Sequence, residues 1–152
     1  MMFQGSNTWN ERSKQQRATL VASLRLLMDD ALRLSQVPFQ LVQGARSIEQ
    51  QQAYFDAGKS KINPKAYADR NKLYADAKHV TGPGMPLARA VDIVIDVKGK
   101  PYDTAHLCYV AGVVMCVARM RGMTIRWGGN FDRDGEILEQ SFDDLPHFEV
   151  DA

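Results

Sequence analysis

Apolar residues near the start of the chain recur at the spacing of a helix. The motif T-x-x-E at Thr8–Glu11 has the form of a capping box, which is typical of a helix N-terminus. The apolar positions beyond it predict one long or broken helix that reaches about Ser35 and is ended by Pro38. The positions that define this spacing are Leu20, Leu24, Leu27, Met28, Ala31 and Leu32.

A second helix, a polar stretch and a loop follow. Ser47–Gln50 forms another capping box and Gly58 suits the position just after a helix, so residues 48–57 are expected to be helical. The polar residues 64–77 leave room for a short helix. The glycines and prolines of residues 79–86 predict a loop.

The most apolar helix is predicted after residue 103. Asp103 or Thr104 can cap it, and Gly122 ends it. Because this segment is apolar nearly all round, we expect a central, buried helix. Cys108 and Cys116 lie more than two helical turns apart in it, too far for a disulfide, and both are expected to be small buried core residues.

Four further segments have the composition of strands. They are residues 38–44, 88–97, 123–127 and 147–150. The mixed order of helices, strands and loops predicts an α+β fold, a single domain with a small, mainly antiparallel sheet flanked by helices. We place this domain at 20–152 and treat 1–19 as an N-terminal helical extension.

Composition and charge exclude several classes of protein. The chain has 152 residues, of which 45% are hydrophobic and 24% charged, values typical of one globular domain. The net charge of +1 gives no overall basic field, so no nucleic-acid partner is expected. No apolar run reaches the roughly 18 residues of a membrane helix, and the N-terminus lacks the apolar segment of a signal peptide. We therefore expect no stable insertion into a membrane.

The candidate chemistry rests on the three histidines and one strand carboxylate. His79 lies in the glycine- and proline-rich loop before the strand that contains Asp92, and His147 begins the last strand. A carboxylate within so apolar a strand needs a partner, because burying an unpaired charge is costly. Two imidazoles and one carboxylate suit zinc with a fourth position open for water, as in a catalytic site. We interpret His106, near the start of the buried helix, as structural or capping.

A water-activating base and a substrate-binding cation have candidates as well. Asp144 precedes His147 by three residues, a spacing that can place a carboxylate beside a metal-bound water, and Asp143 is its rival. Glu149 shares a strand face with His147, so it can orient that ligand. Arg46 lies between a strand and a helix start, where it can bind a substrate carboxylate or a developing oxyanion.

Spacing alone leaves a structural alternative open for each residue. His79 can be an exposed loop residue, Asp92 the partner in an ion pair, and His147 a packed strand residue. Arg46 can be an ordinary surface arginine. The W-G-G motif at 127–129 either lets another backbone segment approach closely or forms a tight turn beside a core tryptophan.

Four segments, taken in order, resemble a family of zinc peptidases. The stretches AKHVTGPGMPLARAVDI and DDLPHFEV resemble the family's metal-ligand patterns S-x-H-x-x-G-x-A-x-D and D-x-P-H-F-E. QGARSIEQQQAYFDAGKSKIN and RWGGNFDRDGE resemble its G-x-R-s-x-x-e-Q segment and its W-G-G loop. The family includes D-alanyl-D-alanine carboxypeptidases and dipeptidases and phage or bacterial L-alanyl-D-glutamate endopeptidases.

This resemblance implies a role for each candidate residue. It implies that His79, Asp92 and His147 bind Zn²⁺ and that Asp144 is the general base. It also implies that Arg46 contacts substrate or stabilises the tetrahedral intermediate. The family's small antiparallel sheet flanked by helices agrees with the order of elements predicted above.

The resemblance implies a zinc-dependent L-alanyl-D-glutamate endopeptidase that cleaves the peptidoglycan stem peptide, in the phage endolysin branch. The chain departs from the family pattern by an insertion, GPGMPLAR, and by alanine where a serine usually lies two residues before the first histidine. An aspartate base, instead of the glutamate of the carboxypeptidase branch, favours the endopeptidase. The alternatives are a D-Ala-D-Ala carboxypeptidase and a non-catalytic, zinc-stabilised cell-wall-binding module.

The same resemblance implies where such a protein acts. We expect a monomer that stays in the host bacterial cytoplasm until a holin releases it. It then acts on the cell wall in the periplasm. The chain has no disulfide framework, which suits a reducing cytoplasm.

Overall fold

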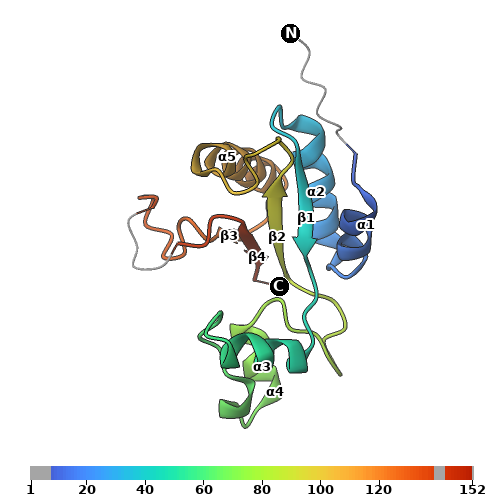
Figure 1. The fold of residues 1–152 in the computed structure, drawn as a ribbon, viewed down its shortest axis with the longest axis vertical. Helices are drawn as coiled ribbons and strands as arrows, with labels where there is room; N and C mark the ends of the chain where they lie inside the picture. Colours follow the sequence, from blue (N-terminus) through green and yellow to red (C-terminus); the bar gives the residue numbers. More distant parts are fainter. Residues whose placement is uncertain (1–7, 139–142, 152) are drawn as a thin grey trace.

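The computed structural model describes residues 8–138 and 143–151, which form an α+β fold (Figure 1). Within this part of the chain a four-stranded sheet has the order β1-β2-β4-β3, and each pair of neighbours is antiparallel. The strands are β1 (Phe39–Gln43), β2 (Ala90–Ile95), β3 (Ile125–Trp127) and β4 (His147–Val150). The predicted fold class and all four predicted strands are confirmed; the first three strands are shorter than predicted, and the last has the predicted bounds.

The N-terminal helical stretch is broken into α1 (Glu11–Ala18) and α2 (Ala22–Leu34). The break lies at Leu20, which is fully buried and pairs with Ala88. The expectation that Thr8 caps the first helix is wrong. The cap is Asn10, whose side chain accepts a hydrogen bond from the backbone N–H of Ser13.

Helix α1 is joined to the edge strand of the sheet by a buried polar contact. The Ser13 hydroxyl donates to the side-chain oxygen of Gln40 at 2.7 Å, and both side chains are buried. The backbone N–H of Leu41 in turn donates to the Ser13 hydroxyl at 2.9 Å. Residues 1–7 lie outside the described part, so the boundary at residue 19 between extension and domain stays a prediction.

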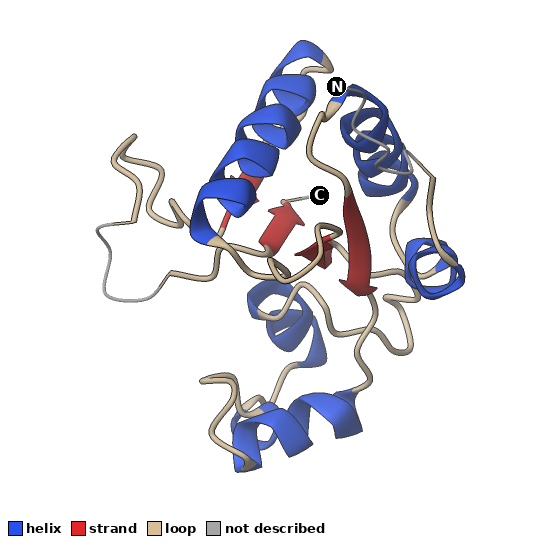
Figure 2. Cartoon of the chain, turned by 45° about the horizontal axis from the view of Figure 1, so that its top comes forward, coloured by secondary structure: helices blue, strands red, loops and turns tan. Residues whose placement is uncertain are grey.

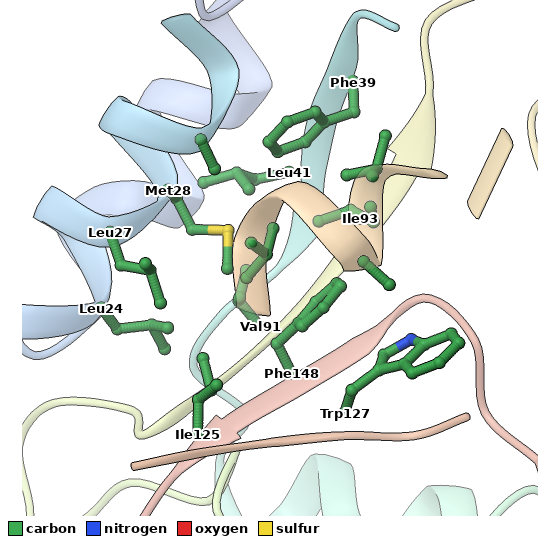
Figure 3. Packing of buried hydrophobic residues seen from close by; sticks show 14 of the residues in the cluster. Leu24, Leu27, Met28, Phe39, Leu41, Val91, Ile93, Ile125, Trp127 and Phe148 are labelled. Carbon is green, nitrogen blue, oxygen red and sulfur yellow. The ribbon is translucent and has the colours of Figure 1, made fainter. Parts of the chain in front are cut away.

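One face of the sheet carries the hydrophobic core (Figure 3). Helices α2 and α5 (Thr104–Met120) pack together over this face (Figure 2). Strand alternation sends Val91 and Ile93 of β2 and Phe148 of β4 into the core. The residues between them therefore point to the opposite face, which holds the polar side chains described below.

Helix α5 is buried on one side only, which corrects the prediction of a central helix. Its buried side faces α2 and the sheet. Tyr109 and Cys116 are exposed and Cys108 is half-buried, so the cysteines are not core residues. Both are free thiols, which agrees with the predicted lack of a disulfide between them. No helix in the described ranges is long and apolar enough to cross a bilayer.

A small helical lobe lies beyond one end of β1 and β2 (Figure 1). It contains α3 (Ile48–Asp56), the 3₁₀ helix η1 (Pro64–Ala66) and α4 (Arg70–Asp76). The capping box predicted at Ser47 is present. The lobe has a separate apolar cluster of Leu73, Tyr74, Ala77 and Val80. It supplies one side of the candidate site, and the polar face of the sheet supplies the other.

Candidate active site

Three side chains from separate segments converge on the polar face of the sheet. His79 Nε2 lies 3.3 Å from Asp92 Oδ1 and 3.2 Å from His147 Nδ1, and His147 Nδ1 lies 3.1 Å from Asp92 Oδ1. Ligand atoms around one tetrahedral zinc ion, with bonds of about 2.0–2.1 Å, are separated by about 3.3 Å. The triangle therefore has the dimensions of three corners of a tetrahedral metal site.

The outer partners of the two histidines determine which ring nitrogens face inward without a proton. His79 Nδ1 lies 2.7 Å from the carbonyl oxygen of Gly44, and His147 Nε2 lies 3.1 Å from Glu149 Oε1. Both oxygens only accept hydrogen bonds, so a neutral ring carries its proton on the outer nitrogen. The inner nitrogens then present lone pairs to each other and to Asp92 Oδ1. Three acceptors facing one another fit a bound cation.

The fold brings these residues together from distant parts of the chain. Asp92 and His147 are directly opposite each other in the pairing of β2 with β4. His79 precedes β2 in a loop that is tied to the segment after β1. The backbone N–H of Arg46 donates to the His79 carbonyl at 2.8 Å, and that of Thr81 donates to the Arg46 carbonyl at 2.9 Å. These two bonds hold His79 over the sheet.

The electrostatics of the metal-free protein follow from this crowding. Burial lowers the pKa of the His147 ring, but hydrogen bonds to Asp92 and Glu149 outweigh burial and raise the pKa to about 9. Burial raises the pKa of the Asp92 carboxyl, yet His79 and His147 together hold that pKa well below its usual range. The two carboxylates that face the His147 ring thus favour positive charge at this point of the cleft.

Glu149 orients His147 and is itself held by an arginine. Its Oε1 accepts from His147 Nε2 and from Arg126 Nη2, both at 3.1 Å. The hydrogen bond suggested by the shared strand face of residues 147 and 149 is therefore present. Arg126 also packs with its guanidinium carbon 5.3 Å from the ring centroid of Phe131. Glu149 Oε2 and Arg126 Nε are buried without a hydrogen-bond partner in the described part of the chain.

Asp144 is the carboxylate beside this cluster. It is half-buried and lines the same cleft as His79, Asp92 and His147. Burial, together with the nearby Asp92 charge, raises the pKa of the Asp144 carboxyl. Asp143, the rival candidate for the base, is exposed and is not part of the cleft lining. The position of Asp144 thus favours it over its neighbour.

The W-G-G motif holds the backbone segment that carries Asp144. The Asp144 N–H donates to the Gly128 carbonyl, and the Gly128 N–H donates to the His147 carbonyl, both at 2.9 Å. The indole N–H of Trp127 donates to the Leu145 carbonyl at 2.8 Å. Trp127 is also a core residue. The motif therefore does both things that its sequence left open, since it places a core tryptophan and permits a close backbone approach.

Arg46 lies in the wall of the cleft, where neutral amides accept its hydrogen bonds. Its Nη1 donates to Gln51 at 2.8 Å and its Nη2 donates to Gln43, and both acceptors are neutral amides. The guanidinium carbon lies 4.3 Å from the centroid of the Tyr54 ring. Arg46 forms no ion pair with a described carboxylate, and its Nε is buried without a partner. Burial lowers the pKa of this guanidinium, while Asp92 counters that effect.

The cleft has a volume of about 400 Å³, within the range of small-molecule sites. Gln51 and Arg126 are among the lining residues that the sequence analysis did not single out. Gln51 is buried and bridges Arg46 to Ser60, where its Nε2 donates at 2.9 Å. Both residues lie in segments that resemble the zinc peptidase family. This resemblance was the sequence feature that could have identified them as part of the site. His106 lies outside the cluster, hydrogen-bonded to Asp103 at the start of α5.

Comparisons with known proteins agree with this architecture. The fold is similar to that of the Serratia marcescens L-Ala D-Glu endopeptidase ChiX, with a TM-score of 0.70 and 24% identity. The match covers 99% of this chain and 95% of that one. At 24% identity, it supports a shared fold and no more. No curated protein matches the chain. The model of the family described as phage L-alanyl-D-glutamate peptidase matches residues 1–150, and the chain belongs to that family.

Proposed function

We propose that this protein is a zinc-dependent endopeptidase that hydrolyses the L-alanyl-D-glutamate bond of the peptidoglycan stem peptide. Family membership supports the substrate and the bond. The proposed metal requirement rests mainly on one observation. Three lone-pair atoms, from His79, Asp92 and His147, lie 3.1–3.3 Å from one another in the cleft. Two imidazoles and one carboxylate form a ligand set with room for a substrate or a water.

The residues around the three ligands fit a catalytic site better than a structural one. Zinc in such a site supplies a Lewis acid and lowers the pKa of water to about 7. Gly44 and Glu149 hold the outer nitrogens of the two histidines and so keep the inner nitrogens directed at the ion. A purely structural zinc site has four protein ligands, and the described residues offer three here.

Asp144 acts as the general base and then as the general acid. Its carboxylate takes a proton from the attacking water and returns it to the amine of D-glutamate as the peptide bond breaks. Burial in the cleft, the largest cause of its raised pKa, favours a carboxylate that can accept a proton. Its place in the cleft lining, beside Asp92 and His147, puts it within the same site as the ligands.

Arg46 stabilises the negative charge that develops on the carbonyl oxygen of the scissile bond. A half-buried guanidinium without a carboxylate partner keeps its charge available for the substrate. The amides of Gln43 and Gln51 and the ring of Tyr54 fix its orientation before substrate arrives. Such preorganised donors contribute most where water is excluded.

The proposal extends to the place of action. A phage enzyme of this family is made in the host cytoplasm as a monomer and meets peptidoglycan after a holin opens the inner membrane. Family membership supports this route.

Digestion of purified peptidoglycan, read by mass spectrometry of the released fragments, tests the proposed bond. We expect new peptides with N-terminal D-glutamate. Loss of a single terminal D-alanine would instead identify a carboxypeptidase. A protein that binds zinc and the wall but releases nothing would be a binding module.

A further inference from the structure

A second cavity adjoins the candidate active site and includes a residue of helix α1. It has a volume of about 270 Å³ and shares Asp92 and Asp144 with the larger cleft described above. The two cavities therefore meet at a proposed metal ligand and the proposed base. A peptide whose scissile bond lies at this point extends from it in both directions, so it needs room in both cavities.

The lining of the second cavity combines aromatic, apolar and hydrogen-bonding side chains. Its two tyrosines are Tyr54 of α3 and Tyr102 of the turn before α5, and Tyr102 is 58% exposed. Among the described residues, the cation of this lining is Arg12 of α1. A small cavity with a few polar groups suits a polar residue of a peptide. Apart from Asp92 and Asp144, the other lining residues are Val42, Gln43, Ile93 and Pro146.

Helix α1 is fixed against β1, and this contact places Arg12 at the cavity (Figure 1). The next residue, Ser13, is fully buried and hydrogen-bonded to Gln40 and Leu41 of β1. Arg12 Nη2 itself donates to the carbonyl oxygen of Val42, also in β1, at 3.2 Å. The guanidinium therefore lies against the strand that leads to Gln43, which accepts a hydrogen bond from Arg46.

The positive charge of Arg12 forms no ion pair with a carboxylate in the described part of the chain. Its hydrogen bond there is to a neutral carbonyl group. Asp92 is held by the two histidines, and neither Asp92 nor Asp144 pairs with Arg12. A guanidinium has five N–H donors, so those that Val42 does not engage are available to an acceptor in the cavity.

We propose that the second cavity is a substrate subsite in which Arg12 binds a carboxylate of the stem peptide. The inference rests on the proposed function. A guanidinium matches a carboxylate, because two of its parallel N–H groups can donate to the two oxygens. The stem peptide offers such groups, since a glutamyl residue continues the chain through only one of its two carboxyl groups and the peptide itself ends in another. Helix α1 thereby takes part in substrate binding.

Arg12→Gln tests this subsite with synthetic stem peptides. On a peptide with both carboxylates free, we expect KM to rise about 3- to 10-fold with kcat nearly unchanged, because Arg12 is exposed and solvent weakens its ion pair. Arg12→Lys keeps the charge and should restore part of the affinity. The matched control is Lys14→Gln, which removes the same charge from the same helix outside both cavities and should keep the parent KM.

Two amidated peptides identify the carboxylate that Arg12 binds. One carries a carboxamide in place of the glutamyl carboxylate, and the other carries it in place of the terminal carboxylate. The difference in KM between the parent protein and Arg12→Gln should disappear on the peptide that lacks the bound group. It should remain on the other peptide.

A KM of Arg12→Gln equal to that of the parent protein on the unmodified peptide would overturn the inference and leave the proposed function intact. A rise in KM that persists on both amidated peptides would also overturn it, because a structural role predicts that result. An equal rise in Lys14→Gln would overturn it as well, since net charge alone would then explain the effect. Cleavage of no peptide by the parent protein would overturn the proposed function, and this inference with it.

Discussion

Gly128 and Asp144 are in such close contact that no side chain fits between them. A β-carbon at residue 128 would lie 1.8 Å from the carbonyl oxygen of Asp144 and 3.0 Å from its β-carbon. The two backbones are also joined by the hydrogen bond from the Asp144 N–H to the Gly128 carbonyl. A glycine in the W-G-G motif therefore places the proposed catalytic base.

Replacement of this glycine should impair the enzyme through Asp144. Gly128→Ala has to displace the segment at residue 144, and overpacking of this kind costs about 1–3 kcal/mol of folding free energy. We expect a lower kcat with zinc still bound, measured by peptide hydrolysis and metal analysis. Gly112→Ala is the control, because a β-carbon there meets nothing within 4 Å. If Gly128→Ala retains full kcat, the close contact does not position the base.

Removal of the charge at residue 144 should separate metal binding from catalysis. Asp144→Asn keeps the shape of the side chain but cannot accept the proton, so hydrolysis should fall by about 100- to 10,000-fold. Zinc content and thermal stability should stay close to those of the parent protein. Asp143→Asn, the exposed neighbour, should retain activity. The reverse pattern would assign the base to Asp143.

The hydrogen bond from His147 to Glu149 should contribute to metal affinity. Glu149→Gln weakens the acceptor that orients the ring, and partners of this kind typically contribute 10- to 100-fold, as an order of magnitude, to metal binding. Competition with a fluorescent zinc chelator measures the change. An unaltered zinc affinity in a folded variant would show that Glu149 serves only to pair with Arg126.

The metal-free protein should become less stable as the pH rises toward 9 and above. The folded pKa of His147, about 9, exceeds the ordinary value of 6.5. Its contribution to stability is therefore fully present below pH 6.5 and is lost as the pH rises through about 9. Urea unfolding of chelated protein at pH 6.5 and pH 9.5 checks this direction. Zinc-loaded protein lacks this proton, so its stability should not show the same loss.

Strand alternation was enough to place Asp92 and His147 on polar faces, but not to pair them. Val91 and Ile93 mark the core side of β2, and Phe148 marks that of β4, so the polar positions follow from the pattern. Which strands are neighbours depends on contacts across more than fifty residues of chain. Local sequence carries no such information, so the chemistry of the side chains and the family resemblance, not the pattern, linked the two residues.

Other features depended on surroundings that the sequence pattern does not record. Helix α5 is apolar nearly all round, yet Cys116 is exposed because the helix packs against α2 and the sheet on one side. Asn10 caps α1 in preference to Thr8, which lies two residues farther from the helix. The contact between Gly128 and Asp144 joins two loops, and the W-G-G motif indicated a close approach without naming the partner.

The zinc requirement of peptidoglycan hydrolysis is the most direct test of the whole account. Purified peptidoglycan is digested with the protein as prepared, after treatment with a chelator, and after zinc is added back. We expect release of peptides with N-terminal D-glutamate, its loss on chelation, and its recovery with zinc. Undiminished release from a protein shown by metal analysis to contain no zinc would contradict the assignment of His79, Asp92 and His147 as catalytic metal ligands.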